Sequence, residues 1–205
     1  MIWKPTIRFG IPTGDTTTEI DVVSLAPHGQ GYGVSTLAYL QYVRSGMLRV
    51  VSPTGRAEDS PITHTYLANV SDYARRLAAE VEEALGDGIP DVVIETPSSR
   101  DLNQPYTRAL LESFPQALDL SSHLRRLGKV KSGEGASARE VLADTVASDV
   151  PWLEGVGTII VVDDVLEAGK AVGAVIARLQ ECGLPATARI ILAVPLVAYR
   201  SSTAG

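Results

Sequence analysis

The sequence has a single cysteine, no excess of basic residues and no long apolar run. One cysteine, Cys182, cannot form a disulfide within the chain, which fits a reducing compartment. The formal net charge of -6 does not favour stable binding to nucleic acid, whose phosphates attract basic proteins. No stretch approaches the roughly 20 apolar residues that cross a membrane, and the first residues lack the apolar core of a signal peptide. We therefore expect a cytoplasmic protein that binds neither membranes nor duplex nucleic acid.

Length and composition fit one α/β domain. The chain has 205 residues, of which 45% are hydrophobic and 20% charged, and a chain of this size can bury its own core. The segment 1–70, rich in Thr, Gly and Pro, is predicted to form an N-terminal extension or hood of the same domain. Residues 71–205 are predicted to form the core.

Hydrophobic patterning predicts alternating strands and helices along the chain. The predicted strands are Glu19–Leu25, Met47–Ser52, Asp91–Glu95, Gln116–Leu120, Gly157–Val162 and Ala188–Val194. The predicted helices are Ser35–Arg44, Ser71–Leu85 with Ser71 as its cap, Asn103–Phe114 and Lys170–Gln180. Apolar strands that alternate with helices predict an α/β fold with a doubly wound, mainly parallel central sheet.

The segment Ser121–Val150 differs in character from the rest of the chain. Its cations are Arg125, Arg126, Lys129, Lys131 and Arg139, and its centre is the run GKVKSGEGAS. This composition favours a mobile surface loop. A solvated charged face without function is the alternative interpretation.

Two adjacent acids, Asp163 and Asp164, follow the apolar run Gly157–Val162. In open α/β sheets, ligands bind beyond the carboxyl ends of the strands. The loop after the acids reaches Gly169 and opens the helix at Lys170, and the first N–H groups of a helix can bind an anion. Acceptors for hydroxyls or a metal therefore lie beside donors for a phosphate, and this pairing matches a sugar phosphate.

The histidines indicate no metal site made by side chains. His28, His64 and His123 are scattered and lack the spacing of metal ligands. The glycine run PHGQGYGVS lacks the strand and helix of a dinucleotide-binding unit, so a turn or a loop beside the site is the better interpretation.

The run Ile159–Ala171 (IIVVDDVLEAGKA) resembles the phosphoribosyl pyrophosphate (PRPP) signature of type I phosphoribosyltransferases. The apolar strand, both acids and Gly169 match that signature. The resemblance implies that Asp163 and Asp164 bind the 2- and 3-hydroxyls of the ribose. It also implies that the backbone of Glu167, Ala168 and Gly169, in the loop that follows, holds the 5-phosphate. That loop consists of Val165, Leu166, Glu167, Ala168, Gly169, Lys170 and Ala171. Mg²⁺ would be carried mainly by the pyrophosphate of PRPP.

The upstream order of elements is similar to that of the same family. The strand from Asp91 resembles the one that leads to the family's pyrophosphate loop, which here would be Thr96, Pro97, Ser98, Ser99 and Arg100. The segment Ser121–Val150 falls where the family has a mobile hood, from which Arg125, Arg126, Lys129 or Lys131 would meet the departing pyrophosphate. The run SSRDLNQPYTRAL resembles the competence-protein F branch. The resemblance covers roughly Ser71 to Leu196 and implies a homodimer.

Three positions depart from the signature and leave three functions open. The family usually has hydroxyl side chains where Glu167, Ala168 and Ala171 stand, and each lost charge-assisted hydrogen bond would cost about 1.5–3 kcal/mol. One function is a Mg²⁺-dependent phosphoribosyltransferase that ribosylates an unidentified nitrogenous base and releases pyrophosphate. Another is a non-catalytic or repurposed domain that senses a nucleotide or phosphoribosyl metabolite. The third is a hydrolase or lyase of a ribosyl phosphate.

Overall fold

The computed structural model describes residues 6–13, 15–25, 49–51, 57–59, 61–97, 102–128, 130, 135–166 and 168–197. The expected helix Ser35–Arg44 lies outside these residues. The expected strand at Met47–Ser52 corresponds to β3 (Arg49–Val51), which pairs with β4 (Ala57–Asp59) in antiparallel fashion.

A six-stranded sheet forms the centre of the fold, in the order β1-β2-β11-β9-β5-β6. Its strands are β1 (Thr6–Thr13), β2 (Thr16–Ser24), β5 (Val92–Glu95), β6 (Leu118–Asp119), β9 (Thr158–Val162) and β11 (Arg189–Val194). All neighbouring pairs are parallel except β1 and β2, which form an antiparallel hairpin. The fold is therefore α/β with a mainly parallel sheet, as the patterning predicted.

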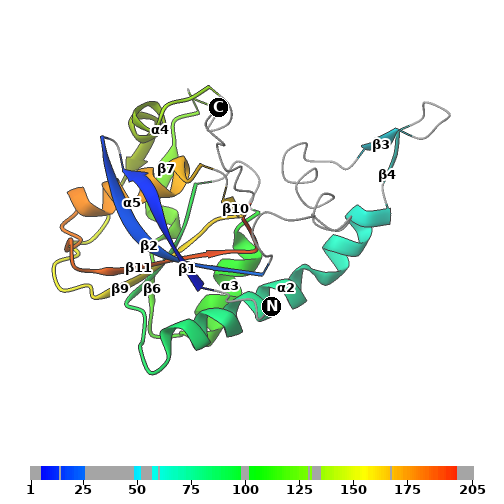
Figure 1. Cartoon of the computed structure of the whole chain (residues 1–205), viewed down its shortest axis with the longest axis horizontal. Coiled ribbons are helices and arrows are strands. Elements are labelled where there is room, and N and C mark those ends of the chain that lie inside the picture. The colour runs from blue at the N-terminus through cyan, green and yellow to red at the C-terminus, as the bar shows by residue number, and fades with distance from the viewer. Residues whose placement is uncertain are drawn as a thin grey trace.

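Helices cover both faces of this sheet (Figure 1). The helices α2 (Pro61–Leu85) and α3 (Gln104–Ser113) pack on one face, and α5 (Lys170–Glu181) packs on the other. Successive residues of β9 alternate between the two sides: Ile160 joins the core under α2 and α3, whereas Val161 joins the core under α5. Burial on both faces explains why the central strands are continuous apolar runs.

The helix α2 begins at Pro61, ahead of the expected cap at Ser71. Ser71 is exposed inside the helix, so its prediction as a cap is wrong. Proline suits the first helical turn because its φ is already helical and its missing N–H has no partner there anyway. The first part of α2 extends beyond the sheet and carries β3 and β4 at its far end (Figure 1).

The segment Ser121–Val150 contains regular elements where a surface loop was expected. They are η1 (Ser121–His123), β7 (Leu124–Arg126), α4 (Ala138–Asp144) and β8 (Thr145–Ala147). β7 pairs with β8, and α4 packs against α5 and β1. The prediction of a loop is therefore wrong for the described part of this segment. Composition was misleading because two charged residues of this segment, Arg126 and Asp144, pair with each other inside the fold instead of facing solvent.

Gly173 allows β1 to lie directly against α5. A Cβ atom at this position would lie 1.8 Å from the carbonyl oxygen of Pro12 and 3.2 Å from Ile11. Ile11 is fully buried in the core beneath α5. The N-terminal hairpin therefore belongs to the central sheet and supports α5.

Candidate functional site

The winding of the chain reverses between β5 and β9. From β5 the chain passes through α3 to β6 on one side, and from β9 it passes through α5 to β11 on the other. Ligands of doubly wound folds bind at such a reversal, beyond the carboxyl ends of the two strands. Thr96 follows β5 and Asp163 follows β9, so both residues lie at this point.

Thr96 and Asp163 form a hydrogen bond across this reversal. The hydroxyl of Thr96 donates to Oδ1 of Asp163 at 2.6 Å, and the backbone N–H of Asp164 donates to the same oxygen at 3.1 Å. Thr96 is 2% exposed and Asp163 is 9% exposed, whereas Asp164 is half-buried. Burying a carboxylate is costly unless hydrogen bonds compensate it. These donors therefore hold Asp163 in place, and Asp164 lies closer to solvent.

The loop after the two acids ends at a left-handed glycine. Gly169 has a φ of 67° and is the N-cap of α5. Most other residues are strained in this conformation, so a glycine suits the entry into the helix. Within the loop, Val165–Leu166 forms β10, which pairs in parallel with β12 (Leu196–Val197). The loop is thus held between α5 and the chain that follows β11.

The start of α5 offers backbone N–H groups but few side-chain donors. A helix N-terminus favours an anion through its dipole and its unpaired N–H groups. Ala168 is exposed and Ala171 is half-buried, and neither has a hydroxyl. The ammonium of Lys170 donates to the carbonyl of Ala136, which precedes α4. A phosphate at this place would therefore depend mainly on the backbone.

The start of α4 is stabilised by a capping box beside Lys170. The side chain of Ser137 accepts from the backbone of Glu140, and the carboxylate of Glu140 accepts from the backbone of Ser137. The backbone and side-chain hydrogen bonds of Ser137 hold the pKa of Glu140 below its ordinary value, and the charge of Lys170 acts in the same direction.

Two neighbouring arginines expected at the pyrophosphate have different surroundings. Arg126 pairs with Asp144 at 2.8 Å, and their side chains are only 17% and 1% exposed. Arg126 also donates to the carbonyl of Val130. Arg125 is exposed. The guanidinium of Arg126 is therefore already bound within the fold.

The structure brings only part of the predicted site together. Thr96, Pro97, Asp163, Asp164 and the ends of the loop at Val165, Leu166 and Gly169 lie at the carboxyl edge of the sheet. The predicted residues Ser98, Ser99, Arg100, Lys129, Lys131 and Glu167 lie outside the described residues.

Asn103 is a residue of this site that the sequence analysis missed. It is 1% exposed, and its Nδ2 donates to the carbonyl of Thr96 at 2.9 Å and to the Thr96 hydroxyl at 3.0 Å. It occupies the N-cap of α3 but makes no side-chain capping bond there. An asparagine before a helical pattern normally predicts a cap. Its bonds to Thr96 are tertiary contacts, which the local pattern does not reveal.

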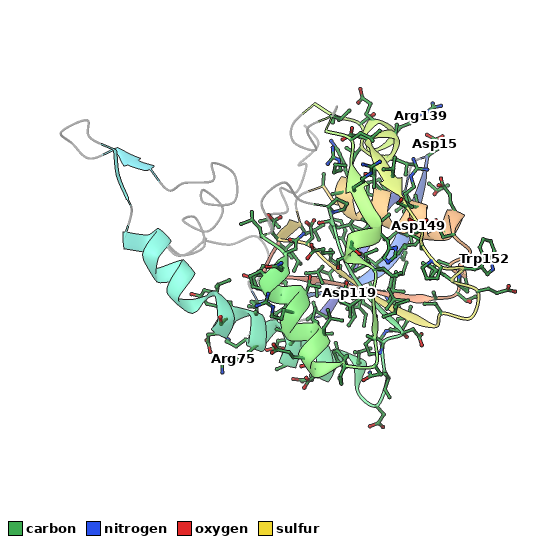
Figure 2. The ribbon with its side chains drawn as sticks, turned by 180° about the vertical axis from the view of Figure 1, so that it is seen from behind. Asp15, Arg75, Asp119, Arg139, Asp149 and Trp152 are labelled. Carbon is green, nitrogen blue, oxygen red and sulfur yellow. The ribbon has the colours of Figure 1, made fainter. Side chains whose placement is uncertain are left out.

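An open groove of about 520 Å³ lies on the α3 side of the same edge. Its lining residues are Glu95, Gln104, Thr107, Arg108, Leu111, Glu112, Asp119, Ser121 and Ser122. Asp119, at the end of β6, is labelled in Figure 2. Thr107 donates to the carboxylate of Glu95 at 2.9 Å. Carboxylates outnumber the arginine in this groove, so its charge is unsuited to a phosphate, and Asp163 does not line it.

The single thiol is a poor nucleophile. Cys182 follows α5 and packs against the core on that side of the sheet. Burial, and then the charge of Glu181, raise the pKa of Cys182, so at neutral pH the thiol stays protonated. In the part of the chain that the structure describes, no three side chains of His, Cys, Asp or Glu gather as metal ligands. Nor does any described helix combine the length and apolarity that crossing a membrane requires.

Comparison with known proteins finds likeness in structure but not in sequence. No protein-family model and no curated protein matches the chain. The xanthine-guanine-hypoxanthine phosphoribosyltransferase of Helicobacter pylori is 13% identical, with a TM-score of 0.41, over 64% of this chain and 88% of its own. The orotate phosphoribosyltransferase of Aeropyrum pernix is 21% identical, with a TM-score of 0.38, over 82% of this chain and 94% of its own. Likeness at this level carries no argument about function, and neither match supports the competence-protein F branch in particular.

Proposed function

We propose that this chain binds PRPP together with Mg²⁺ beyond the carboxyl ends of β5 and β9, and transfers its phosphoribosyl group to a nitrogenous base. The observation that carries the proposal is the position of Asp163 at the reversal of winding, followed by Asp164 and by the left-handed Gly169 that opens α5. Carboxylates accept hydroxyl hydrogens, and a helix N-terminus binds a phosphate. A ribose 5-phosphate needs both groups side by side.

In this reaction the protein orients the sugar and stabilises charge. Asp163 and Asp164 accept the ribose hydroxyls, and the backbone of the loop Val165–Ala171 holds the 5-phosphate. Bound Mg²⁺ would neutralise charge on the pyrophosphate. The bond from the anomeric carbon to the pyrophosphate oxygen breaks, a bond to the base nitrogen forms, and the base releases a proton. The two carboxylates favour the positive charge that develops on the ribose ring.

The departing pyrophosphate requires donors on the other side of the sugar. In our proposal the loop from Thr96 to Arg100 supplies them through Ser98, Ser99 and Arg100. Pro97 has no N–H, and the N–H and hydroxyl of Thr96 donate to Val162 and Asp163. The exposed Arg125 and the lysines Lys129 and Lys131 add positive charge, and Arg126 supports that segment through Asp144. We further propose that the protein acts as a homodimer, with the acceptor base left open.

A second candidate function is binding without turnover. It is favoured by the two alanines at the start of α5, Ala168 and Ala171, which give a phosphate no hydroxyl donors. It is also favoured by the bond from Lys170 to Ala136, which engages the ammonium next to Gly169 within the fold. In that case the domain would sense a nucleotide or phosphoribosyl metabolite.

Calorimetric titration of PRPP with and without Mg²⁺ tests the site. We expect binding that depends on Mg²⁺, and about a hundredfold loss in the double variant Asp163→Asn/Asp164→Asn, because each carboxylate gives up one charge-assisted hydrogen bond. Asparagine keeps the size of each side chain. Glu112→Gln, which removes an exposed carboxylate of the α3 groove, is the matched control and should bind normally. Equal binding by the double variant, or no binding at millimolar PRPP, would contradict the proposal.

Threonine at positions 167, 168 and 171 tests the second candidate. Restoring hydroxyl donors in Glu167→Thr/Ala168→Thr/Ala171→Thr is expected to tighten PRPP binding about tenfold or more, because donors to a charged phosphate strengthen it. Product formation with a panel of bases would then show whether turnover returns with affinity. The matched control carries valine at the same three positions, which has the shape of threonine without the hydroxyl. Equal affinity of the two triple variants would show that hydroxyls are not what the loop lacks.

A further inference from the structure

A chain of hydrogen bonds connects α3 to β9 through the end of β5. Nδ2 of Asn103 donates to the hydroxyl of Thr96 at 3.0 Å, and that hydroxyl donates to Oδ1 of Asp163 at 2.6 Å. The three residues are 1%, 2% and 9% exposed, so little water competes for these bonds. The chain crosses the reversal of winding at the point where the proposed sugar site lies.

The chemistry of the groups fixes the direction of this chain. A backbone carbonyl can only accept, so the bond to the carbonyl of Thr96 at 2.9 Å identifies Nδ2 as the end of Asn103 that faces Thr96. The Thr96 hydroxyl accepts from Nδ2 and has one hydrogen of its own. That hydrogen therefore goes to Asp163.

In this orientation, one polar atom of the Asn103 side chain stays without a hydrogen bond. Its Oδ1 is buried and has no hydrogen-bond partner among the described residues. A buried acceptor without a donor destabilises the folded protein. The asparagine is therefore held by its two Nδ2 bonds to Thr96, at the cost of one unpaired oxygen.

We infer that Asn103 is a positioning residue that orients the carboxylate of Asp163 through the hydroxyl of Thr96. This inference rests on the proposed function of Asp163. Oδ1 of Asp163 receives the hydrogens of Thr96 and of the backbone of Asp164, and two donors to one oxygen fix the plane of the carboxylate. An acceptor already fixed before the sugar binds loses less rotational freedom on binding. Asn103 therefore raises affinity for the ribose without touching it.

A mutant cycle on Asn103 and Thr96 tests this inference, with calorimetric titration of PRPP and Mg²⁺ as the readout. Thr96→Val is expected to weaken binding about tenfold and Thr96→Ser to restore it to within about twofold, because serine keeps the donor. Asn103→Ala is expected to weaken binding about fivefold alone but not further in the Thr96→Val background, because the relay is already broken. If Asn103→Ala does not fold, Asn103→Leu replaces it, since leucine keeps a similar size and removes the donor without adding a charge.

The outcomes separate the relay from the function on which it rests. Additive losses in the two variants, or no rescue by serine, would overturn the relay. If the folded wild-type protein does not bind PRPP, the proposed function fails, and the relay is tested without ligand by the midpoints of urea unfolding. With the native Thr96, the effects of Asn103→Ala and Asp163→Asn on that midpoint should be non-additive. In the Thr96→Val background, the same two effects should be additive. Additivity in both backgrounds would overturn the relay in that case too.

Discussion

Replacing Gly173 by alanine is expected to destabilise the protein by about 3 kcal/mol, because overpacking a close contact typically costs about 1–3 kcal/mol and more where backbone must move. The added Cβ would lie 1.8 Å from the carbonyl oxygen of Pro12. That atom belongs to β1, whose backbone pairs with β2 along its whole length, so it cannot shift without disturbing the hairpin. The helix α5 and the strand β1 would be forced apart.

The melting temperature and the urea midpoint measure this effect. For a chain of this size, about 3 kcal/mol corresponds to a fall of about 6–12 °C in the melting temperature. Gly157→Ala is the matched control, because its Cβ would lie 3.6 Å from the carboxylate of Asp91, an ordinary contact. If both variants melt alike, β1 does not lie against α5 as closely as described.

Replacing Arg126 by alanine is expected to destabilise the protein by about 3–5 kcal/mol, the cost of removing one partner of a buried ion pair. Asp144 is 2% exposed and would stay charged in the interior after losing Arg126. The bond to the carbonyl of Val130 would be lost as well. The segment from β7 to β8 should therefore loosen first.

Urea unfolding of matched variants distinguishes the effect of breaking this ion pair from the effect of removing a positive charge. Arg125→Ala removes the neighbouring exposed arginine and should change stability by less than about 0.5 kcal/mol, as surface substitutions usually do. Adding Asp144→Asn to Arg126→Ala should recover part of the loss, because no carboxylate then stays buried without its arginine. If Arg126→Ala kept full stability and weakened only PRPP binding, Arg126 would act at the ligand and not in the fold.

Patterning predicted the central parallel strands well because they are buried on both faces. Runs such as Gly157–Val162 and Ala188–Val194 have few polar residues, as is typical of the central strands of an α/β sheet. The strand β1 was not predicted although Ile7, Phe9 and Ile11 alternate with other residues, because the glycine and proline in TIRFGIPT argue against a strand. Its place depends on β2 and on Gly173, far along the chain. Such contacts leave no local signal.

The same distinction holds for the site. Asp163, Asp164 and Gly169 form one contiguous run, so the sequence predicts them together. Asn103 is linked to Asp163 through Thr96, although the asparagine and the aspartate are 60 positions apart in the sequence. Arg126 and Asp144 are 18 positions apart in the sequence, so the local composition did not reveal that this arginine is paired inside the fold. Composition records charges but does not record their partners.

The two edges of the sheet have a consequence for how copies of this chain can associate. An exposed edge strand normally invites another strand to pair with it. Here β6 has only two residues, and β1 carries Pro12, which has no N–H to donate, and the exposed, charged Arg8. Short, charged and proline-bearing edges discourage both aggregation and continuation of the sheet between molecules. Self-association of this protein is therefore expected to use helix and loop surfaces and not a shared sheet.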